Sequence, residues 1–169
     1  MPSRLTSNHF VGRVGELAEL ELAVREASAG RPTLVLLGGD SGVGKTRLVG
    51  ELEQRLSLSA TEGRRDGETG VLILRGDGVE QADGELPYAP LLSALRPLVR
   101  ERHPALEDLS PGGRQQLATI LPGLEDPGRP ADVRFANDQV RLFEAVLELI
   151  DRLTTSAPLI LILDRKSVV

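Results

Sequence analysis

The residues most able to do chemistry lie in one short stretch, residues 38–46, which reads GGDSGVGKT. Its spacing fits the pattern G-x-x-x-x-G-K-[ST] of a phosphate-binding P-loop. Glycines adopt positive φ at little cost and let backbone N–H groups approach an anion closely. The lysine supplies a point charge for the β- and γ-phosphates, and the threonine hydroxyl is a magnesium ligand. We therefore predict a nucleoside triphosphate site made of Gly39, Asp40, Ser41, Gly42, Val43, Gly44, Lys45 and Thr46.

A second candidate residue follows an apolar run, residues 159–163. Asp164 comes directly after this run. In P-loop NTPases, an acid at the carboxyl end of such a Walker B strand holds the magnesium ion opposite the P-loop hydroxyl. A buried strand that ends in a surface aspartate is also common, so this interpretation depends on the P-loop upstream. Together the two motifs predict ATP and Mg²⁺ as ligands, with Thr46 and Asp164 on the metal.

The elements that flank the glycine-rich stretch are those that must position it. Residues 33–37, TLVLL, form a short apolar run typical of a buried parallel strand. After the loop, Leu48, Val49, Leu52 and Leu56 recur at helical spacing up to residue 57. The order strand, loop, helix places the backbone N–H groups of the loop at a helix N-terminus, where the positive end of the helix dipole also favours an anion.

The rest of the chain alternates between helical and strand patterns, which predicts an α/β fold. Leu17, Leu20, Val24 and Ala27 mark one face of a helix that ends at residues 30–32. The longest predicted helix, over residues 134–155, has an apolar face broad enough to pack on a sheet. We also predict a polar loop over 57–70, a strand over 71–74, an acidic solvated loop with Asp77, Glu80, Asp83 and Glu85, helices over 88–102 and 111–121, and a loop over 122–132.

Composition narrows the class of protein further. The chain has 169 residues, of which 40% are hydrophobic and 2% aromatic, so a single core must be built from aliphatic side chains. It contains no cysteine, which excludes disulfides and thiolate metal sites. No apolar run reaches the length of a membrane span and the N-terminus is no signal peptide, so we expect a cytoplasmic protein without membrane contact. The net charge of −5 argues against direct nucleic-acid contact.

Several stretches together resemble the ATPase domain of the STAND class of AAA-type P-loop proteins, the origin-recognition-like AAA ATPases found in large LuxR-type (MalT-like) bacterial transcription regulators. Residues 10–13, FVGR, followed by Glu16 and Leu17, are similar to the FVGR-x-x-EL box of that family. The P-loop continues into Arg47 and Leu48, as it does there. Weaker likenesses lie at residues 86–91, LPYAPL, and 141–144, RLFE.

The resemblance implies a three-layer α/β/α P-loop NTPase fold with a parallel sheet, truncated after the Walker B strand. It places the P-loop strand between two strands that follow Walker B, beyond residue 164. It also implies that Val11, Gly12 and Arg13 lie near the adenine and ribose, whereas the structural alternative for these three residues is a helix-entry turn. The implied function is a nucleotide-dependent switch that controls effector domains, with DNA binding left to a missing C-terminal domain and oligomerisation open to the full-length protein.

The chain departs from the family after Asp164. The family continues with a second acid that positions the attacking water, but Arg165 stands there and cannot accept a hydrogen bond from water. We therefore identify no complete catalytic set. The full-length parent is expected to be an ATPase, and this chain to hydrolyse ATP negligibly.

The last residues look foreign to the family. DRKSVV can be back-translated as GATCGGAAGAGCGTCGTG, which matches a common adapter in DNA sequencing libraries. We therefore expect that the reading frame ran into adapter sequence, whereas the alternative is a natural C-terminus ending in RKSVV. The string begins at the Asp164 codon, although the family pattern itself calls for aspartate there. We expect a polar leader over 1–9, a partial ATP-binding domain over 10–164 and a non-native tail over 165–169.

Two other functions use the same motif. An AAA-type motor or loader would need intersubunit contacts and an arginine finger. A small-molecule or nucleoside kinase would carry substrate-binding and lid arginines soon after the loop, and residues 57–70 show no clear sign of them. The FVGR box separates the switch and the motor from the kinase.

Overall fold

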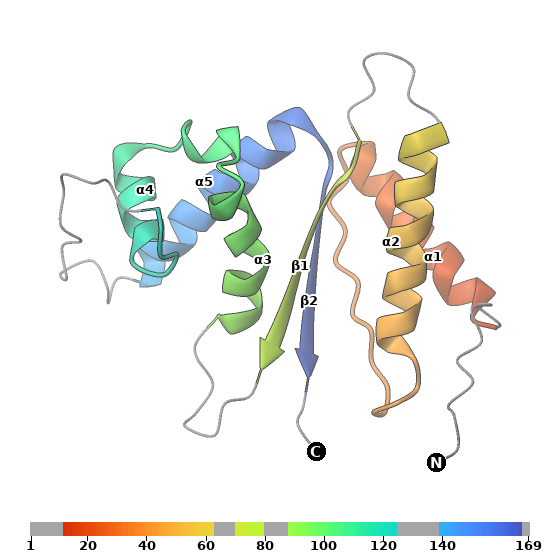
Figure 1. Cartoon of the computed structure of the whole chain (residues 1–169). Helices are drawn as coiled ribbons and strands as arrows, with labels where there is room; N and C mark the ends of the chain where they lie inside the picture. The colour runs from red at the N-terminus through yellow and green to blue at the C-terminus, as the bar shows by residue number, and fades with distance from the viewer. Residues whose placement is uncertain (1–11, 63–69, 80–87, 125–138, 167–169) are drawn as a thin grey trace. The chain divides into compact units, whose positions relative to one another are not determined.

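The computed structural model describes residues 12–62, 70–79, 88–124 and 139–166. By their contacts they fall into two units, Met1–Glu68 and Thr69–Val169 (Figure 1). The P-loop lies in the first unit and the apolar run ending in Asp164 lies in the second. Each unit is described by itself below.

The first unit is a pair of helices joined by the P-loop segment. Helix α1 spans Val14–Ser28 and helix α2 spans Lys45–Glu62. Leu17, Leu20, Leu48 and Leu52 form a buried cluster between them, and Val24 and Leu56 pack at its edge. The helical spacing of these leucines therefore predicted the packed faces correctly. Arg55 of α2 links the helices at the surface, with its Nη1 3.0 Å from Glu21 Oε1.

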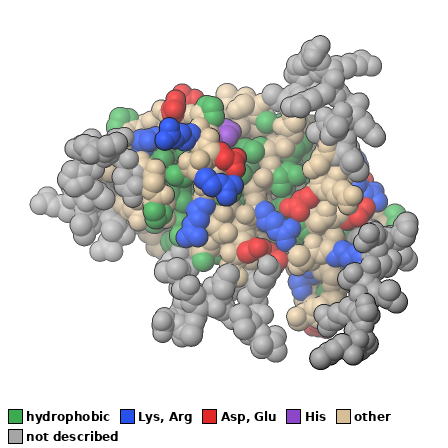
Figure 2. Space-filling model, viewed as in Figure 1, with side chains coloured by type: hydrophobic (Ala, Val, Ile, Leu, Met, Phe, Trp, Pro, Cys, Tyr) green, Lys and Arg blue, Asp and Glu red, His purple; other side chains and the backbone are tan. Residues whose placement is uncertain are grey.

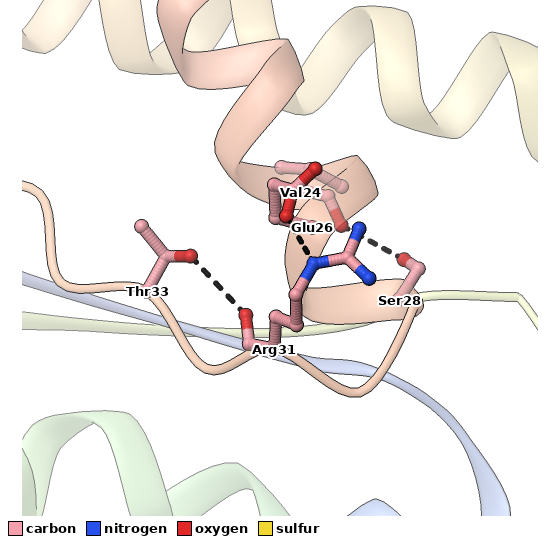
Figure 3. Close-up of polar contacts among 5 residues, drawn as sticks. All are labelled: Val24, Glu26, Ser28, Arg31 and Thr33. Carbon is pink, nitrogen blue, oxygen red and sulfur yellow. Dashed lines mark hydrogen bonds and ion pairs between the residues drawn. The ribbon is translucent and has the colours of Figure 1, made fainter.

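The end of α1 fixes the direction in which the chain leaves for the P-loop (Figure 3). Gly30 has φ of 79°, its N–H donates to the Ala27 carbonyl, and the Arg31 N–H donates to the Glu26 carbonyl. This is a Schellman cap, which needs a residue that tolerates positive φ. The Arg31 side chain also turns back to donate to the Glu26 carboxylate, and Thr33 Oγ1 donates to the Arg31 carbonyl at 3.2 Å. The predicted helix stop at residues 30–32 is confirmed.

The strand predicted over residues 33–37 does not form. Residues 31–40 have no assigned secondary structure, and Leu34 and Leu36 are each 84% exposed. A strand is stable only when its backbone groups are paired with a neighbouring strand, and the other elements described in the first unit are helices. The prediction of a buried strand over residues 33–37 is therefore wrong for this structure.

The second unit is built on two parallel strands. Strand β1 spans Leu72–Val79 and strand β2 spans Leu159–Lys166, with Leu72 opposite Leu159 and Asp77 opposite Asp164 (Figure 1). Strand β1 begins one residue later than predicted and ends five residues later, because the ladder with β2 continues through residues 75–79. Asp77 is consequently in a strand, and its assignment to a solvated loop is wrong.

One face of this sheet is covered by helix α3, Ala89–Arg100. The approach is very close, since a Cβ built on Gly76 would lie 1.6 Å from the Pro90 carbonyl oxygen. A Cβ on Gly78 would lie 2.9 Å from Pro90 Cγ. The two glycines are therefore required by packing, and they identify the α3 side of β1 as the face of residues 74, 76 and 78.

Two further helices complete the unit, after a short 3-10 helix at Pro104–Leu106. Helix α4 spans Pro111–Ala118 and helix α5 spans Gln139–Ser156, and the two pack together. Ser110 caps α4, its Oγ accepting from the Gly113 N–H at 3.0 Å. Glu148 of α5 holds this cap, accepting from the Ser110 N–H at 2.6 Å and from Ser110 Oγ at 2.8 Å.

Only part of the apolar face of α5 is buried. Leu142, Val146, Leu149 and Leu153 are buried, whereas Val140, Phe143 and Leu147 are exposed. Helix α5 packs mainly on α4 and to a smaller extent on β2, so the prediction that its broad apolar face packs against a sheet is confirmed only in part. At the edge of this face, the rings of Tyr88 and Phe143 meet edge to face, with centroids 5.7 Å apart.

Other element boundaries differ from the predictions by a few residues. Helix α2 continues to Glu62, where the sequence predicted a loop from residue 57, because the first strong helix breaker after Lys45 other than Gly50 is Gly63. Helix α4 stops at Ala118 rather than 121. The predicted start of the last helix at residue 134 lies outside the described residues, as do Glu80, Asp83 and Glu85.

Candidate nucleotide-binding site

The glycines of residues 38–46 adopt the backbone geometry that the motif requires. Gly39, Gly42 and Gly44 have φ of 140°, 82° and 91°. Non-glycine residues rarely adopt such values, so each glycine serves the turn of the loop. Helix α2 starts directly after the last of them, at Lys45, and its first turn is closed by the Leu48 N–H donating to the Gly44 carbonyl at 3.0 Å. The loop thus ends at a helix N-terminus, the arrangement that favours bound phosphate.

Lys45 folds back over the loop that precedes it. Its Nζ donates to the carbonyls of Gly39 at 2.7 Å and Asp40 at 3.0 Å. The ammonium group therefore lies against the backbone of the loop and supplies a positive charge there, as the motif requires. Residues 39–43 are exposed, so a ligand can reach the loop from solvent. Thr46 lies in the first turn of α2 with its side chain exposed.

The FVGR box is described in part. Gly12 has φ of 86° and Arg13 has φ of 54°, and Arg13 is the N-cap of α1, its carbonyl accepting from the Leu17 N–H at 3.1 Å. These two residues therefore form the entry turn of α1, as the structural alternative predicted. Their contact with adenine and ribose stays a prediction, and Val11 lies outside the described residues.

Asp164 lies in strand β2, in register with Asp77 of β1. Its Oδ2 is 4.0 Å from Arg75 Nη2, and Asp77 Oδ1 is 3.8 Å from Arg75 Nε. Two carboxylates and one guanidinium thus share this part of the sheet. The sequence pointed to Asp164 alone. The alternation of charged residues with glycine over residues 75–78, RGDG, was the period-two signal that could have extended β1 to Asp77.

The chemistry of the predicted magnesium ligands fits the ion. Mg²⁺ is usually held by one or two carboxylates together with substrate phosphates and waters, rather than by a cage of protein ligands. Within the described ranges no three acidic or histidine side chains gather into a metal-binding group. Thr46 supplies a hydroxyl in the first unit, and Asp164 supplies a carboxylate in the second.

On the face drawn in Figure 2, acidic and basic side chains of the described residues lie among one another and do not gather by sign. None of the described helices is long and apolar enough to cross a membrane.

The glycine-rich loop at a helix N-terminus and the parallel strands define a P-loop NTPase of the α/β class. Residues 9–165 match the family model described as the AAA ATPase domain. The match covers nearly the whole sequence, so the chain belongs to the AAA ATPase domain family and is a nucleotide-binding ATPase module of that class. No curated protein and no solved structure matches the chain.

Proposed function

We propose that this chain binds ATP with Mg²⁺ through residues 39–46 and acts as the nucleotide-dependent switch of a LuxR-type transcription regulator. The observation that carries the ATP site is the position of Lys45, whose Nζ lies over the loop on the carbonyls of Gly39 and Asp40. The backbone N–H groups of the loop would hold the β- and γ-phosphates, and Lys45 would balance their charge.

When bound, the magnesium ion would neutralise charge between the β- and γ-phosphates. Thr46 and Asp164 are the residues we assign to it. Arg165 follows Asp164 where a water-positioning acid would be needed, so we propose that ATP is held and hydrolysed negligibly. Gly12 and Arg13, with Val11, are assigned to the adenine and ribose on the strength of the FVGR box.

The regulatory role rests on the resemblance of residues 10–13, 86–91 and 141–144 to the STAND proteins. Membership of the AAA family supports a switch or a motor over a small-molecule kinase. The FVGR box together with the GKTRL form of the P-loop supports the switch.

Lys45→Ala tests the ATP site. A charge-assisted hydrogen bond contributes about 1.5–3 kcal/mol, so the substitution should weaken binding of a fluorescent ATP analogue by about ten- to a hundredfold in equilibrium titrations. Arg25→Ala removes an exposed cation from α1 in the same unit and should bind like the wild type. Equal affinity of Lys45→Ala and the wild type, with an unchanged melting curve, would rule out a P-loop role for Lys45.

A further inference from the structure

One acidic residue lies inside the glycine-rich loop. Asp40 is the only aspartate or glutamate among residues 27–50. Its backbone is part of the loop, because its carbonyl accepts from Lys45 Nζ at 3.0 Å and from the Val43 N–H at 3.5 Å. A negative side chain at this position opposes the binding of phosphate, since like charges repel each other.

The Asp40 side chain makes no contact that would hold the loop in place. Asp40 begins the turn that the Val43 N–H closes, and an aspartate in that position often accepts a backbone hydrogen bond through its carboxylate. Among the residues that the structure describes, however, none donates to the Asp40 carboxylate or forms an ion pair with it. Lys45 donates to the carbonyl of Asp40 instead. The carboxylate is therefore an exposed charge that no neighbouring cation offsets by contact.

Covalent geometry nevertheless keeps this charge close to the place where phosphates would bind. The carboxylate oxygens of an aspartate lie within about 6 Å of its own carbonyl oxygen. Since the Asp40 carbonyl is 3.0 Å from Lys45 Nζ, the carboxylate lies within about 9 Å of that ammonium group. The Debye length is about 8 Å at physiological ionic strength, so salt screens the charge only in part. All of these groups belong to the first unit.

We propose that Asp40 is a specificity-determining residue of the P-loop, which selects magnesium-bound nucleotide over free nucleotide. The proposal rests on the proposed function, in which Lys45 faces the β- and γ-phosphates. ATP carries about four negative charges in neutral solution and keeps about two of them when Mg²⁺ is bound to its phosphates. Repulsion by Asp40 is proportional to the charge of the ligand, so it is about twice as strong for free ATP as for the magnesium form.

Asp40→Asn removes the charge and keeps the shape of the side chain. The measurement is the affinity for ATP by titration calorimetry, once with EDTA and once with excess Mg²⁺, at low ionic strength where screening is weak. Free ATP should bind about five- to tenfold more tightly to the variant, and magnesium ATP about two- to threefold more tightly. The preference for the magnesium form should therefore fall about threefold.

Two matched variants control for the loss of the charge itself. Asp40→Glu keeps the charge and should bind both forms like the wild type. Glu19→Gln removes an exposed acid from α1 in the same unit and should leave the preference unchanged. Because the effect is electrostatic, added salt should reduce the difference between Asp40→Asn and the wild type.

Two further readouts separate a charge effect from a structural one. Inorganic tripolyphosphate lacks adenine and ribose, so its metal-free affinity should rise in Asp40→Asn by about the same factor as that of ATP. The melting temperature of nucleotide-free Asp40→Asn should equal that of the wild type, because the described residues make no contact with the carboxylate. A clearly lower melting temperature would show that the carboxylate holds the loop, and would overturn the proposal.

The binding results also distinguish this proposal from the proposed function. If Asp40→Asn changes the affinity for both forms by the same factor, or changes neither, Asp40 does not select between them. If it weakens binding of the magnesium form alone, the carboxylate binds the ion and the repulsive role is wrong. If Lys45→Ala binds ATP as tightly as the wild type, the proposed function fails and the role of Asp40 fails with it.

Discussion

At the scale of single residues, the Lys45 and Arg31 side chains each hold a short segment of chain in place by hydrogen bonds to earlier residues. Lys45 bonds two carbonyls of its own loop, and Arg31 returns to Glu26 across the cap of α1. Both contacts are local in sequence. They fix the two ends of the segment that carries the P-loop through contacts that involve no distant strand.

The Glu26–Arg31 pair makes the stability of the fold depend on pH, and the lowered pKa of Glu26 determines the direction of that dependence. The Arg31 hydrogen bond holds the pKa of Glu26 below its ordinary value. A carboxyl with a lowered folded-state pKa stabilises the fold above its unfolded pKa, and this contribution is lost as the pH falls through the folded pKa. Arg31→Gln should therefore raise the pKa of Glu26, measured by NMR titration of the side-chain carboxyl.

Thermal melts provide the second readout of this pair. Because both side chains are exposed to solvent, Arg31→Gln should lower the melting temperature at pH 7 by no more than about 2 °C, and the difference should vanish in acid. Arg25→Gln is the matched control, since Arg25 affects the pKa of Glu26 only as a lesser, through-space charge. An unchanged pKa of Glu26 in Arg31→Gln would contradict the assigned contact.

At the scale of elements, the close packing of helix α3 on strand β1 accounts for the unusual residue types in that strand. The strand contains Gly76, Asp77 and Gly78, residue types that are depleted in strands. It forms nevertheless, because β2 pairs with its whole length and because only glycine lets the start of α3 approach so closely. The ladder with β2 also places Asp77 opposite Asp164.

Gly76→Ala tests that contact. A Cβ there would lie within 3 Å of three backbone atoms of α3, including the Pro90 carbonyl oxygen and the Ala94 nitrogen, so either the helix or the strand must move. Overpacking of this kind costs about 1–3 kcal/mol and sometimes more, and the loss should appear in urea or thermal unfolding.

The matched control for Gly76 is Gly112, which lies in α4 with nothing within 4 Å of its ideal Cβ. Gly112→Ala should stabilise the chain slightly, by up to about 1 kcal/mol, because alanine loses less backbone entropy in a helix. Equal stability of the Gly76→Ala variant and the wild type would mean that α3 does not lie against β1 as described.

At the scale of the whole molecule, the described residues bury two separate apolar clusters, one in each unit. The segment 33–37 joins neither cluster, and it exposes aliphatic side chains in a row. Exposed segments of high β propensity and low charge favour association between chains.

Replacing Leu34 and Leu36 together by glutamine should therefore reduce concentration-dependent light scattering. The melting temperature should change little, because each side chain is already 84% exposed and contributes little burial. Leu17→Gln, at a position only 2% exposed, is the contrasting control and should destabilise the fold strongly. A drop in melting temperature for the Leu34/Leu36 variant as large as that for Leu17→Gln would show that the segment is buried.

The sequence alone determined the features that depend on near neighbours in the chain. The spacing of Gly39, Gly44, Lys45 and Thr46 located the loop, and the structure confirms its positive φ angles and the helix that follows. Helical periodicity identified the packed leucines of α1 and α2, and Gly30 marked the helix stop. These signals were readable because helix contacts and caps join residues a few positions apart.

Only the tertiary structure decided which strands pair and how far. Apolar composition gave residues 33–37 and 159–163 the same strand signal, yet only the second run lies in a ladder. Likewise, the extension of β1 to Asp77 depends on β2, more than eighty positions away in the chain. Strand pairing is a contact between distant segments, and the residues of one strand do not indicate which other strand it pairs with. Asp77 lies opposite Asp164 for that reason, and no local pattern predicts this pairing.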